Sequence, residues 1–242
     1  MKTFSITDAG AIREMNQDFY FSSDTAVGNL PNLFIVADGM GGHKAGDYAS
    51  RYTIERVVAS VSRNAGDEPV SIIKEAINKA NELLLAESRE DEAKRGMGTT
   101  LVIGTIIGNK LFVANIGDSR LYIVGGTEQI RQITRDHSLV DEMVRMGEIN
   151  ADEARVHPDK NIITRAVGAA DHVEADFFEV ELCEDDRILL CTDGLTNMVR
   201  DEEICDTIRQ NDNIETAASQ LVAMANANGG RDNITVMIIK PF

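Results

Sequence analysis

The stretch that most restricts the possible folds covers residues 97–126 and reads MGTTLVIGTIIGNKLFVANIGDSRLYIVGG. It contains three apolar segments that are separated only by the short links 108–109 and 117–119. Two parallel neighbours need a crossover connection of about a dozen residues or more, so links this short join antiparallel neighbours. We therefore expect an antiparallel meander at the centre of the protein, which excludes a doubly wound parallel sheet.

Helices and further strands are predicted on both sides of this meander. Apolar residues at helical spacing predict helices at 46–62 and 70–88, and a serine cap with a glycine stop predicts a short helix over 138–147. The other expected elements are strands at 2–7, 19–22, 33–37, 187–192 and 233–240 and helices at 201–210 and 214–226. This order fits antiparallel sheets that are covered by helices on their outer faces.

The length and composition narrow the class of protein further. The 242 residues contain no repeat, no low-complexity tract and only four prolines, so we expect a single domain over residues 1–242. No apolar run is long enough to span a bilayer, and the N-terminal stretch lacks the apolar region of a signal peptide. The net charge of −16 argues against nucleic acid or an anionic membrane as a partner.

The cysteines bear on the cellular compartment. Cys183, Cys191 and Cys205 are an odd number of thiols and have no metal-binding spacing. We expect them to be reduced thiols in the core, which favours a cytoplasmic location.

A glycine-rich loop follows one of the predicted strands, in the stretch FIVADGMGGHKAGD at residues 34–47. A dinucleotide-binding loop is disfavoured because Lys44 stands where the third glycine belongs, and a Walker loop is excluded because G-K-[ST] is absent. A tight turn with a solvated aspartate remains the ordinary interpretation of a lone Asp-Gly pair. However, Asp38 follows four apolar residues, and a buried carboxylate is costly unless something pairs with it.

The Asp-Gly pair at Asp38 is not alone. Aspartates also stand at the ends of other apolar strands, namely Asp18, Asp118, Asp193 and Asp232. Strand ends in a pair of sheets share a rim, so these carboxylates can converge, and converging carboxylates are tolerated when they are protonated or bind cations. Oxygen ligands select hard cations, which predicts Mg²⁺ or Mn²⁺ as the partner of Asp38.

Eight short motifs occur along the chain, and their order is informative. They are R-x-x-N-Q-D at residues 13–18, followed by VADGMGGHKAGD, GTT, NIGDSRLY, TRDHS, TRAVG, LLCTDGL and GGRDNITV. In this order they resemble the protein phosphatase 2C family of metal-dependent serine/threonine phosphatases, especially its compact bacterial members. The resemblance covers nearly the whole chain. It implies an α+β fold, a four-layer α-β-β-α sandwich of two antiparallel sheets flanked by helix pairs.

The resemblance also implies a metal-ligand set. Asp38 matches the carboxylate that bridges two metal ions, and the carbonyl of Gly39 matches a ligand of one of them. Asp193 and Asp232 match the other protein ligands of the first ion. Asp118 matches the aspartate that holds a third ion together with Asp193 in bacterial members. The implied cofactor is thus Mn²⁺ or Mg²⁺, with two ions at the core and a third beside them.

Three further residues are candidates for catalytic roles. By resemblance, Arg13 clamps the substrate phosphate, and Asp18 accepts a hydrogen bond from metal-bound water. Met40 stands where eukaryotic relatives carry a general-acid histidine, and His43 is the nearest histidine, to be interpreted either as that proton donor or as an ordinary loop residue. Gln17 stands where many eukaryotic relatives carry a glutamate.

The implied reaction is the hydrolysis of phosphoserine and phosphothreonine in proteins by a metal-activated water, opposing a cognate Ser/Thr kinase. The expected enzyme is a monomer. The sequence has no C-x₅-R or G-x-S-x-G nucleophile motif. Two other classes remain as rivals: an inactive relative that binds phosphoproteins, although no metal aspartate is missing, and a metal-dependent nuclease, which the net charge disfavours. Residues 138–165, here called the flap, are expected to lie beside the active site and to select substrates.

Overall fold

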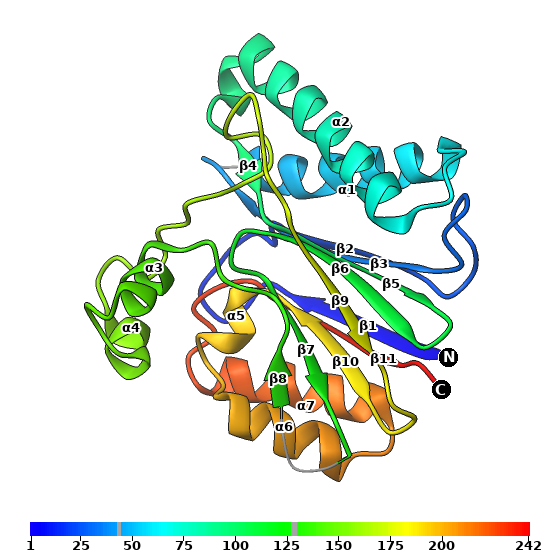
Figure 1. The fold of residues 1–242 in the computed structure, drawn as a ribbon. Helices are drawn as coiled ribbons and strands as arrows, with labels where there is room; N and C mark the ends of the chain where they lie inside the picture. Colours follow the sequence, from blue (N-terminus) through cyan, green and yellow to red (C-terminus); the bar gives the residue numbers. More distant parts are fainter. Residues whose placement is uncertain (43–44, 127–129) are drawn as a thin grey trace.

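The structure is a computed structural model, and it describes residues 1–42, 45–126 and 130–242. Its strands form two antiparallel sheets (Figure 1). Sheet I has the order β1-β11-β10-β7-β8 and consists of β1 (Lys2–Asp8), β11 (Ile234–Lys240), β10 (Arg187–Cys191), β7 (Arg120–Val124) and β8 (Ile130–Gln132). Sheet II has the order β2-β3-β5-β6-β9 and consists of β2 (Asp18–Ser23), β3 (Leu33–Met40), β5 (Leu101–Ile107), β6 (Lys110–Ile116) and β9 (Asp176–Glu181). The short β4 (Gly98–Thr99) pairs with β3.

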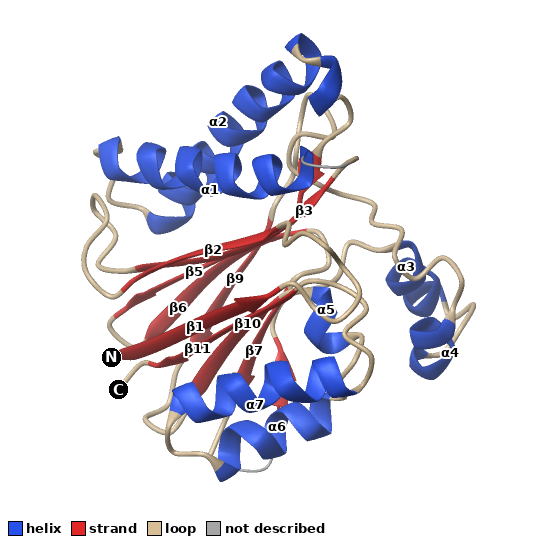
Figure 2. Ribbon diagram, turned by 180° about the vertical axis from the view of Figure 1, so that it is seen from behind, coloured by secondary structure: helices blue, strands red, loops and turns tan. Residues whose placement is uncertain are grey.

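Helix pairs cover the outer faces of both sheets (Figure 2). The helices α1 (Ala45–Arg63) and α2 (Pro69–Glu90) lie on sheet II, and α6 (Asp201–Gln210) and α7 (Ile214–Ala227) lie on sheet I. Between the sheets, side chains such as Phe34 of sheet II and Met237 of sheet I share one buried cluster. The predicted α-β-β-α arrangement of four layers is therefore confirmed. The apolar helix faces predicted from the sequence account for the packing of the helices on the sheet, because Ile54 of α1 and Ile73 of α2 are buried in the core beneath these helices.

The predicted central meander is wrong at its second link. The strands β5 and β6 form the expected hairpin, but β7 pairs with β10 and β8 instead of β6. The link at residues 117–119 therefore carries the chain from sheet II to sheet I. Facing sheets lie about 10 Å apart and an extended residue spans about 3.3 Å, so three residues suffice for this step. All three strands are apolar on both faces, so hydrophobicity alone did not distinguish one sheet from two.

Gly117 makes the crossing possible. Its φ is +96°, and a Cβ added there would lie 2.6 Å from Cγ2 of Thr100. Only glycine fits both the left-handed backbone and the close approach. The crossing places Asp118, the next residue, at the gap between the two sheets.

The flap leaves the layers on one side of the molecule (Figure 1). The helix predicted over 138–147 is present as α3 (Leu139–Met146), with Ser138 as its N-cap and Gly147 in the left-handed conformation at its end. A second helix, α4 (Ala151–Val156), was not predicted, although Asn150 and Glu153 form a capping box. Strands β4, β8 and β9 and the short helices α5 (Asp193–Thr196) and η1 (Glu92–Lys94) were also not predicted.

Two smaller expectations concern the cysteines and the membrane. All three thiols are free, and Cys191 and Cys205 are buried as expected, but Cys183 is exposed in the turn before β10 and is not a core thiol. In the described ranges, no helix combines the length and the apolar character needed to cross a bilayer.

Candidate metal centre

Five strand ends bring the predicted aspartates to one rim of the sandwich. Asp18 begins β2 and pairs in register with Asp38 near the end of β3. Asp193 follows β10, whereas Asp118 and Asp232 shortly precede β7 and β11. Because the neighbouring strands are antiparallel, all of these ends lie at the same edge of the two sheets. We call this set (Asp18, Asp38, Asp118, Asp193 and Asp232) the aspartate rim.

The carboxylates of the aspartate rim repel one another. Burial raises the pKa of Asp38 well above its usual value, and the charges of the other four aspartates raise it further. Burial likewise raises the pKa of Asp118, with Asp193 as the strongest neighbouring charge. Burial brings the pKa of Asp193 to about 6, with Asp232 adding to the shift. Without a cation, the aspartate rim is thus under electrostatic strain that protons relieve.

Asp18 is the most deeply placed of these carboxylates, with 4% of its surface exposed. Its Oδ2 accepts hydrogen bonds from Thr192 Oγ1 at 2.8 Å and from Thr235 Oγ1 at 2.7 Å. Burial nevertheless raises the pKa of Asp18 to about 7. Its second oxygen, Oδ1, is buried and has no hydrogen-bond partner among the described residues.

Asp193, like Asp18, has one hydrogen-bonded carboxylate oxygen and one oxygen without a partner among the described residues. Asn197 Nδ2 donates to its Oδ2 at 2.8 Å, whereas its Oδ1 is buried without a partner in the described part of the chain. Buried carboxylate oxygens rarely stay unsatisfied in native proteins, so each such oxygen calls for a missing partner. Oxygen donors of this kind suit Mg²⁺ or Mn²⁺.

The aspartate rim is not a preformed metal cage. Across the described ranges, no three acidic, histidine or cysteine side chains stand in an arrangement that could hold a metal ion as they are. The carboxylates repel one another as long as no cation lies between them. The residues fit hard cations by donor type, burial and unsatisfied oxygens, and cation binding would draw them together.

Position 39 must be a glycine because the surrounding backbone leaves no room for a side chain. Its φ is not in the left-handed region, but a Cβ added there would lie 1.9 Å from the carbonyl oxygen of Gly46 and 2.7 Å from that of Gln17. Glycine therefore lets the end of β3 pack directly on α1 and on the chain before Asp18. The predicted role of the Gly39 carbonyl as a metal ligand stays a prediction.

Arg13 lies at the aspartate rim, where its guanidinium contacts the carboxylate of Asp232. Its Nη2 donates to Asp232 Oδ2 at 2.7 Å, and about half of its side chain is exposed. Asn233 N–H donates to the other oxygen of Asp232 at 2.9 Å. The structure thus brings Arg13 to the predicted site, where it is the counter-charge of a predicted metal ligand. His43, the candidate proton donor, lies outside the described residues.

Several residues that hold the aspartate rim were missed in the sequence. Thr100 Oγ1 accepts the Asp38 N–H at 2.8 Å and lies 2.7 Å from Ser119 Oγ, which connects the end of β3 to the turn of Asp118. Asn233 accepts the Gln17 N–H at 2.8 Å. These residues belong to the motifs GTT, NIGDSRLY and GGRDNITV. In the sequence, a hydroxyl or amide side chain close to an aspartate at a strand end was the signal that could have identified them.

Arg120 supplies positive charge beside the aspartate rim. Its guanidinium binds Asp136 through two nitrogens, with Nε 2.9 Å from Oδ1 and Nη2 2.7 Å from Oδ2. Burial raises the pKa of Asp118 and Asp193, the charge of Arg120 opposes that rise, and the charge of Asp136 adds to it. This paired cation offsets only part of the repulsion, so the centre keeps an excess of negative charge.

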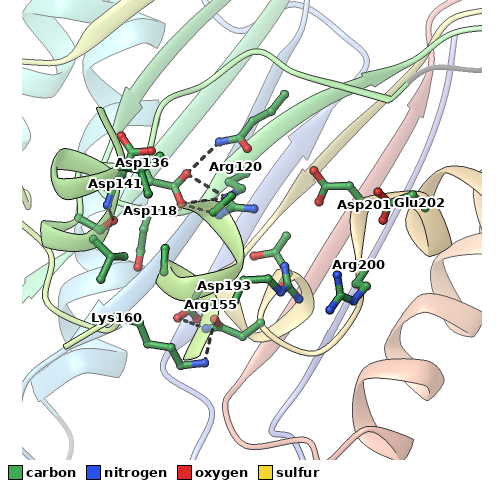
Figure 3. A pocket seen from close by; sticks show the side chains of 18 residues that line it. Asp118, Arg120, Asp136, Asp141, Arg155, Lys160, Asp193, Arg200, Asp201 and Glu202 are labelled. Atoms are coloured by element: carbon green, nitrogen blue, oxygen red, sulfur yellow. Dashed lines mark hydrogen bonds and ion pairs between the residues drawn. The ribbon is translucent and has the colours of Figure 1, made fainter. Parts of the chain in front are cut away.

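A pocket of about 360 Å³ opens between the aspartate rim and the flap (Figure 3). Asp118 and Asp193 form part of its wall, and Arg155 and Lys160 of the flap and Arg200 before α6 line it as well. Arg155 Nη2 donates to the Thr196 carbonyl at 3.1 Å, and the charge of Lys160 lowers the pKa of Asp193. The pocket wall therefore combines carboxylates, Asp141 of the flap among them, with cations from the flap and from the segment before α6.

Known proteins resemble this chain over most of its length. The family model described as Protein phosphatase 2C matches residues 10–234. The chain is 38% identical over 242 residues to the serine/threonine phosphatase stp of Listeria welshimeri, covering 97% of this chain and 93% of that protein.

Solved structures share the fold over almost the full length. The crystal structure of serine/threonine phosphatase Stp1 from Staphylococcus aureus superposes with a TM-score of 0.91 at 34% identity, covering 98% of this chain and 93% of that one. The catalytic domain of the serine threonine protein phosphatase PstP, solved in complex with 2 manganese ions, gives a TM-score of 0.85 at 32% identity, covering 98% of this chain and 96% of that one. With the sandwich, the aspartate rim and these matches together, the chain belongs to the protein phosphatase 2C family.

Proposed function

We propose that this chain hydrolyses phosphoserine and phosphothreonine in proteins, uses Mn²⁺ or Mg²⁺ to do so, and opposes a Ser/Thr protein kinase. The observation that carries the proposal is the aspartate rim, in which two buried carboxylate oxygens lack a partner among the described residues. The named phosphatases among the similar proteins and the manganese ions of one solved relative support it.

The chain's own residues divide into ligands and supports. Asp38, Asp193 and Asp232, with the carbonyl of Gly39, would hold two ions, and Asp118 with Asp193 would hold a third. Ions bound there would lower the pKa of a water molecule and neutralise the oxygens of the phosphoryl group. The hydroxyls of Thr192 and Thr235 keep Asp18 turned so that its free oxygen can accept a proton or a hydrogen bond.

Arg13 would orient the phosphate. When Asp232 serves as a metal ligand, it no longer needs Arg13 as its counter-charge. The half-exposed guanidinium can then donate two parallel hydrogen bonds to phosphate oxygens, an arrangement that favours arginine over lysine.

The flap would receive the rest of the substrate. A phosphoprotein carries residues on both sides of the phosphorylated one, and the pocket between the aspartate rim and the flap offers Arg155, Lys160 and Arg200 to them. We regard residues 1–242 as one catalytic domain in which the flap is the substrate-selecting part. A cytoplasmic location is proposed on the free thiols, and a monomer is proposed by resemblance to the family. Nucleic acid is disfavoured as a substrate by the net charge of −16.

The test measures phosphate release from a phosphothreonine peptide and, in parallel, strand cleavage of a single-stranded DNA oligonucleotide. Hydrolysis of the peptide alone, in the presence of Mn²⁺ or Mg²⁺ and abolished by EDTA, is the expected result. Full activity after metal stripping would overturn the mechanism, cleavage of the oligonucleotide would favour a nuclease, and tight peptide binding without phosphate release would indicate an inactive phosphoprotein binder.

A further inference from the structure

His137 occupies the junction between the flap and the turn of Asp118. It lies directly before the flap, and only 6% of its surface is exposed. Its ring lies between Gly117 on one side and Asp176, the first residue of β9, on the other. None of the roles assigned above to the metal ligands or to Arg13 uses this histidine.

The hydrogen bonds fix the tautomer of the ring. The Gly117 N–H donates to Nδ1 at 3.1 Å, so Nδ1 carries no proton and Nε2 does. Nε2 faces Asp176 Oδ2 at 3.3 Å. Arg165 Nη1 lies equally near Nε2, but two donors do not bind each other, and Arg165 donates instead to Asp176 Oδ1 at 2.9 Å. Burial lowers the pKa of His137, in agreement with a neutral ring.

The backbone of His137 completes the junction. Its N–H donates to the Gly117 carbonyl at 3.0 Å, so His137 satisfies both backbone groups of the residue before Asp118. Its own carbonyl accepts the Thr164 N–H at 2.7 Å, which belongs to the returning leg of the flap. Close by, the Leu139 N–H donates to the Ile162 carbonyl at 2.9 Å. Both legs of the flap thus meet at the residue that holds the turn of Asp118.

We infer that His137 is a positioning residue whose ring sets the turn that carries Asp118 and couples that turn to the flap. The inference rests on the proposed function, in which Asp118 holds the third ion. Asn115 Nδ2 also donates to the Gly117 carbonyl at 3.3 Å and Ser119 Oγ lies 2.7 Å from Thr100 Oγ1, but the acceptor that the structure gives the Gly117 N–H is the ring of His137. Loss of the Nδ1 acceptor would leave a buried N–H unpaired and let the turn shift, and Asp118 would move with it. Movement of the flap would be transmitted to Asp118 by the same route.

Two substitutions separate the two nitrogens of the ring. In His137→Asn the amide oxygen can take the place of Nδ1 and still accept the Gly117 N–H, whereas contact with Asp176 is lost. In His137→Gln the amide nitrogen can take the place of Nε2 and still donate to Asp176, whereas the acceptor for Gly117 is lost. His172→Gln is the control, because His172 is an exposed histidine outside the junction.

The first measurement is calorimetric titration of each variant with Mn²⁺. We expect His137→Gln to weaken the weakest Mn²⁺ step by about tenfold or more while the tighter steps stay unchanged, as is usual when a residue that supports a metal ligand is lost. His137→Asn should stay within about threefold of the parent, and His172→Gln should match the parent. Equal losses in the Asn and Gln variants, or parental affinity in His137→Gln, would overturn the inference.

The second measurement is amide hydrogen exchange of the flap with and without saturating Mn²⁺. The parent and His137→Asn should exchange more slowly with Mn²⁺, whereas His137→Gln should show no difference. If Mn²⁺ does not slow amide exchange in the flap of the parent protein, the coupling is refuted. This outcome can be measured even if His137→Gln fails to fold. Asp118→Asn separates the proposed third metal site from the proposed role of His137. If Asp118→Asn keeps every Mn²⁺-binding step, the proposed third site is wrong. If Asp118→Asn loses the weakest step while His137→Gln keeps it, the role of His137 is wrong.

Discussion

The aspartate rim and the flap face each other across one pocket, but they are built in opposite ways. Asp18 is almost completely buried and is held by Thr192 and Thr235, both of which are fully buried. On the flap, α3 buries only Val140, and no residue of α4 is buried. The rim is thus fixed by the two sheets, whereas the flap is held by its two legs and by polar contacts such as that of Arg155 with the Thr196 carbonyl.

This difference suits the two regions to different tasks. Groups that must be held at a fixed separation for chemistry profit from a buried, hydrogen-bonded scaffold. A surface that meets many protein substrates profits from exposed and adaptable side chains. If the comparison holds, changes at the rim should affect every substrate, whereas changes on the flap should distinguish between substrates.

The largest effect should come from the carboxylates themselves. Asp38→Asn and Asp193→Asn should each lower kcat by about a thousandfold or more, because the ligands that create the nucleophile are lost. The metal-free stability should stay the same or rise, because a repelling charge is removed. The kcat is measured by phosphate release and the stability by thermal unfolding in EDTA, with Asp24→Asn at an exposed position as the control. Activity within a few-fold of the parent would contradict the ligand assignment.

The second-largest effect should come from Arg13, and it tests whether this residue at the rim binds the substrate phosphate. Arg13→Ala should lower kcat/KM by about a hundredfold for every phosphate ester, because charge-assisted hydrogen bonds to the phosphate are lost. Mn²⁺ affinity should stay the same or increase, because Asp232 loses a competing partner. Calorimetry together with steady-state kinetics separates the two quantities. Loss of a metal site in the calorimetric titration would show that Arg13 is a structural residue.

The third prediction uses pH to measure the strain in the metal-free rim. The pKa of Asp18 is about 7 in the folded protein against an ordinary value of 3.8, so the folded state binds this proton more tightly than the unfolded state does. The resulting stabilisation is fully present below pH 4 and is lost as the pH rises through 7. We expect unfolding in EDTA to become easier by about 2 kcal/mol between pH 5 and pH 8. Asp18→Asn should reduce this dependence without abolishing it, because the pKa values of Asp38, Asp118 and Asp193 are raised as well. A stability that rises over the same interval would refute the prediction.

The smallest effect should come from the flap. Glu148→Ala and His157→Ala should change kcat/KM for phosphopeptides more than for a small aryl phosphate, because only the larger substrate reaches the flap. A tenfold difference between the two substrates would correspond to about 1.4 kcal/mol of differential binding. Two Michaelis curves per variant provide the measurement, with Glu75→Ala on α2 as the control. Equal losses on both substrates would place the flap within the catalytic machinery.

Much of this organisation could be predicted from the sequence. Helical spacing located α1, α2, α6 and α7 within a few residues, and the apolar runs located the long strands. The positions of the five aspartates were predictable because polar residues that end apolar strands must gather at a sheet edge. Their roles as ligands were implied by resemblance and remain to be tested.

Other features could not be predicted, for physical reasons. The strand β7 is apolar on both faces, so its pattern did not reveal that it pairs with β10 instead of β6. The strand β9 is short and half-exposed, and it owes its place to pairing with β6. The contact between Arg13 and Asp232 joins residues that are 219 positions apart and has no local signal. The same holds for His137, whose partners lie on three separate segments.

The pairing of β1 with β11 has a consequence for how the protein is made. These strands come from the two ends of the described chain, and Thr235 of β11 contacts Asp18 across 217 positions. A nascent chain can form the β5–β6 hairpin and its helices early, because these contacts are local, but sheet I has no partner for β1 until β11 has left the ribosome. Contacts of such long range close late in folding. The aspartate rim can therefore be completed only after β11 has formed, and a polypeptide that ends before Asp232 lacks one of its five carboxylates.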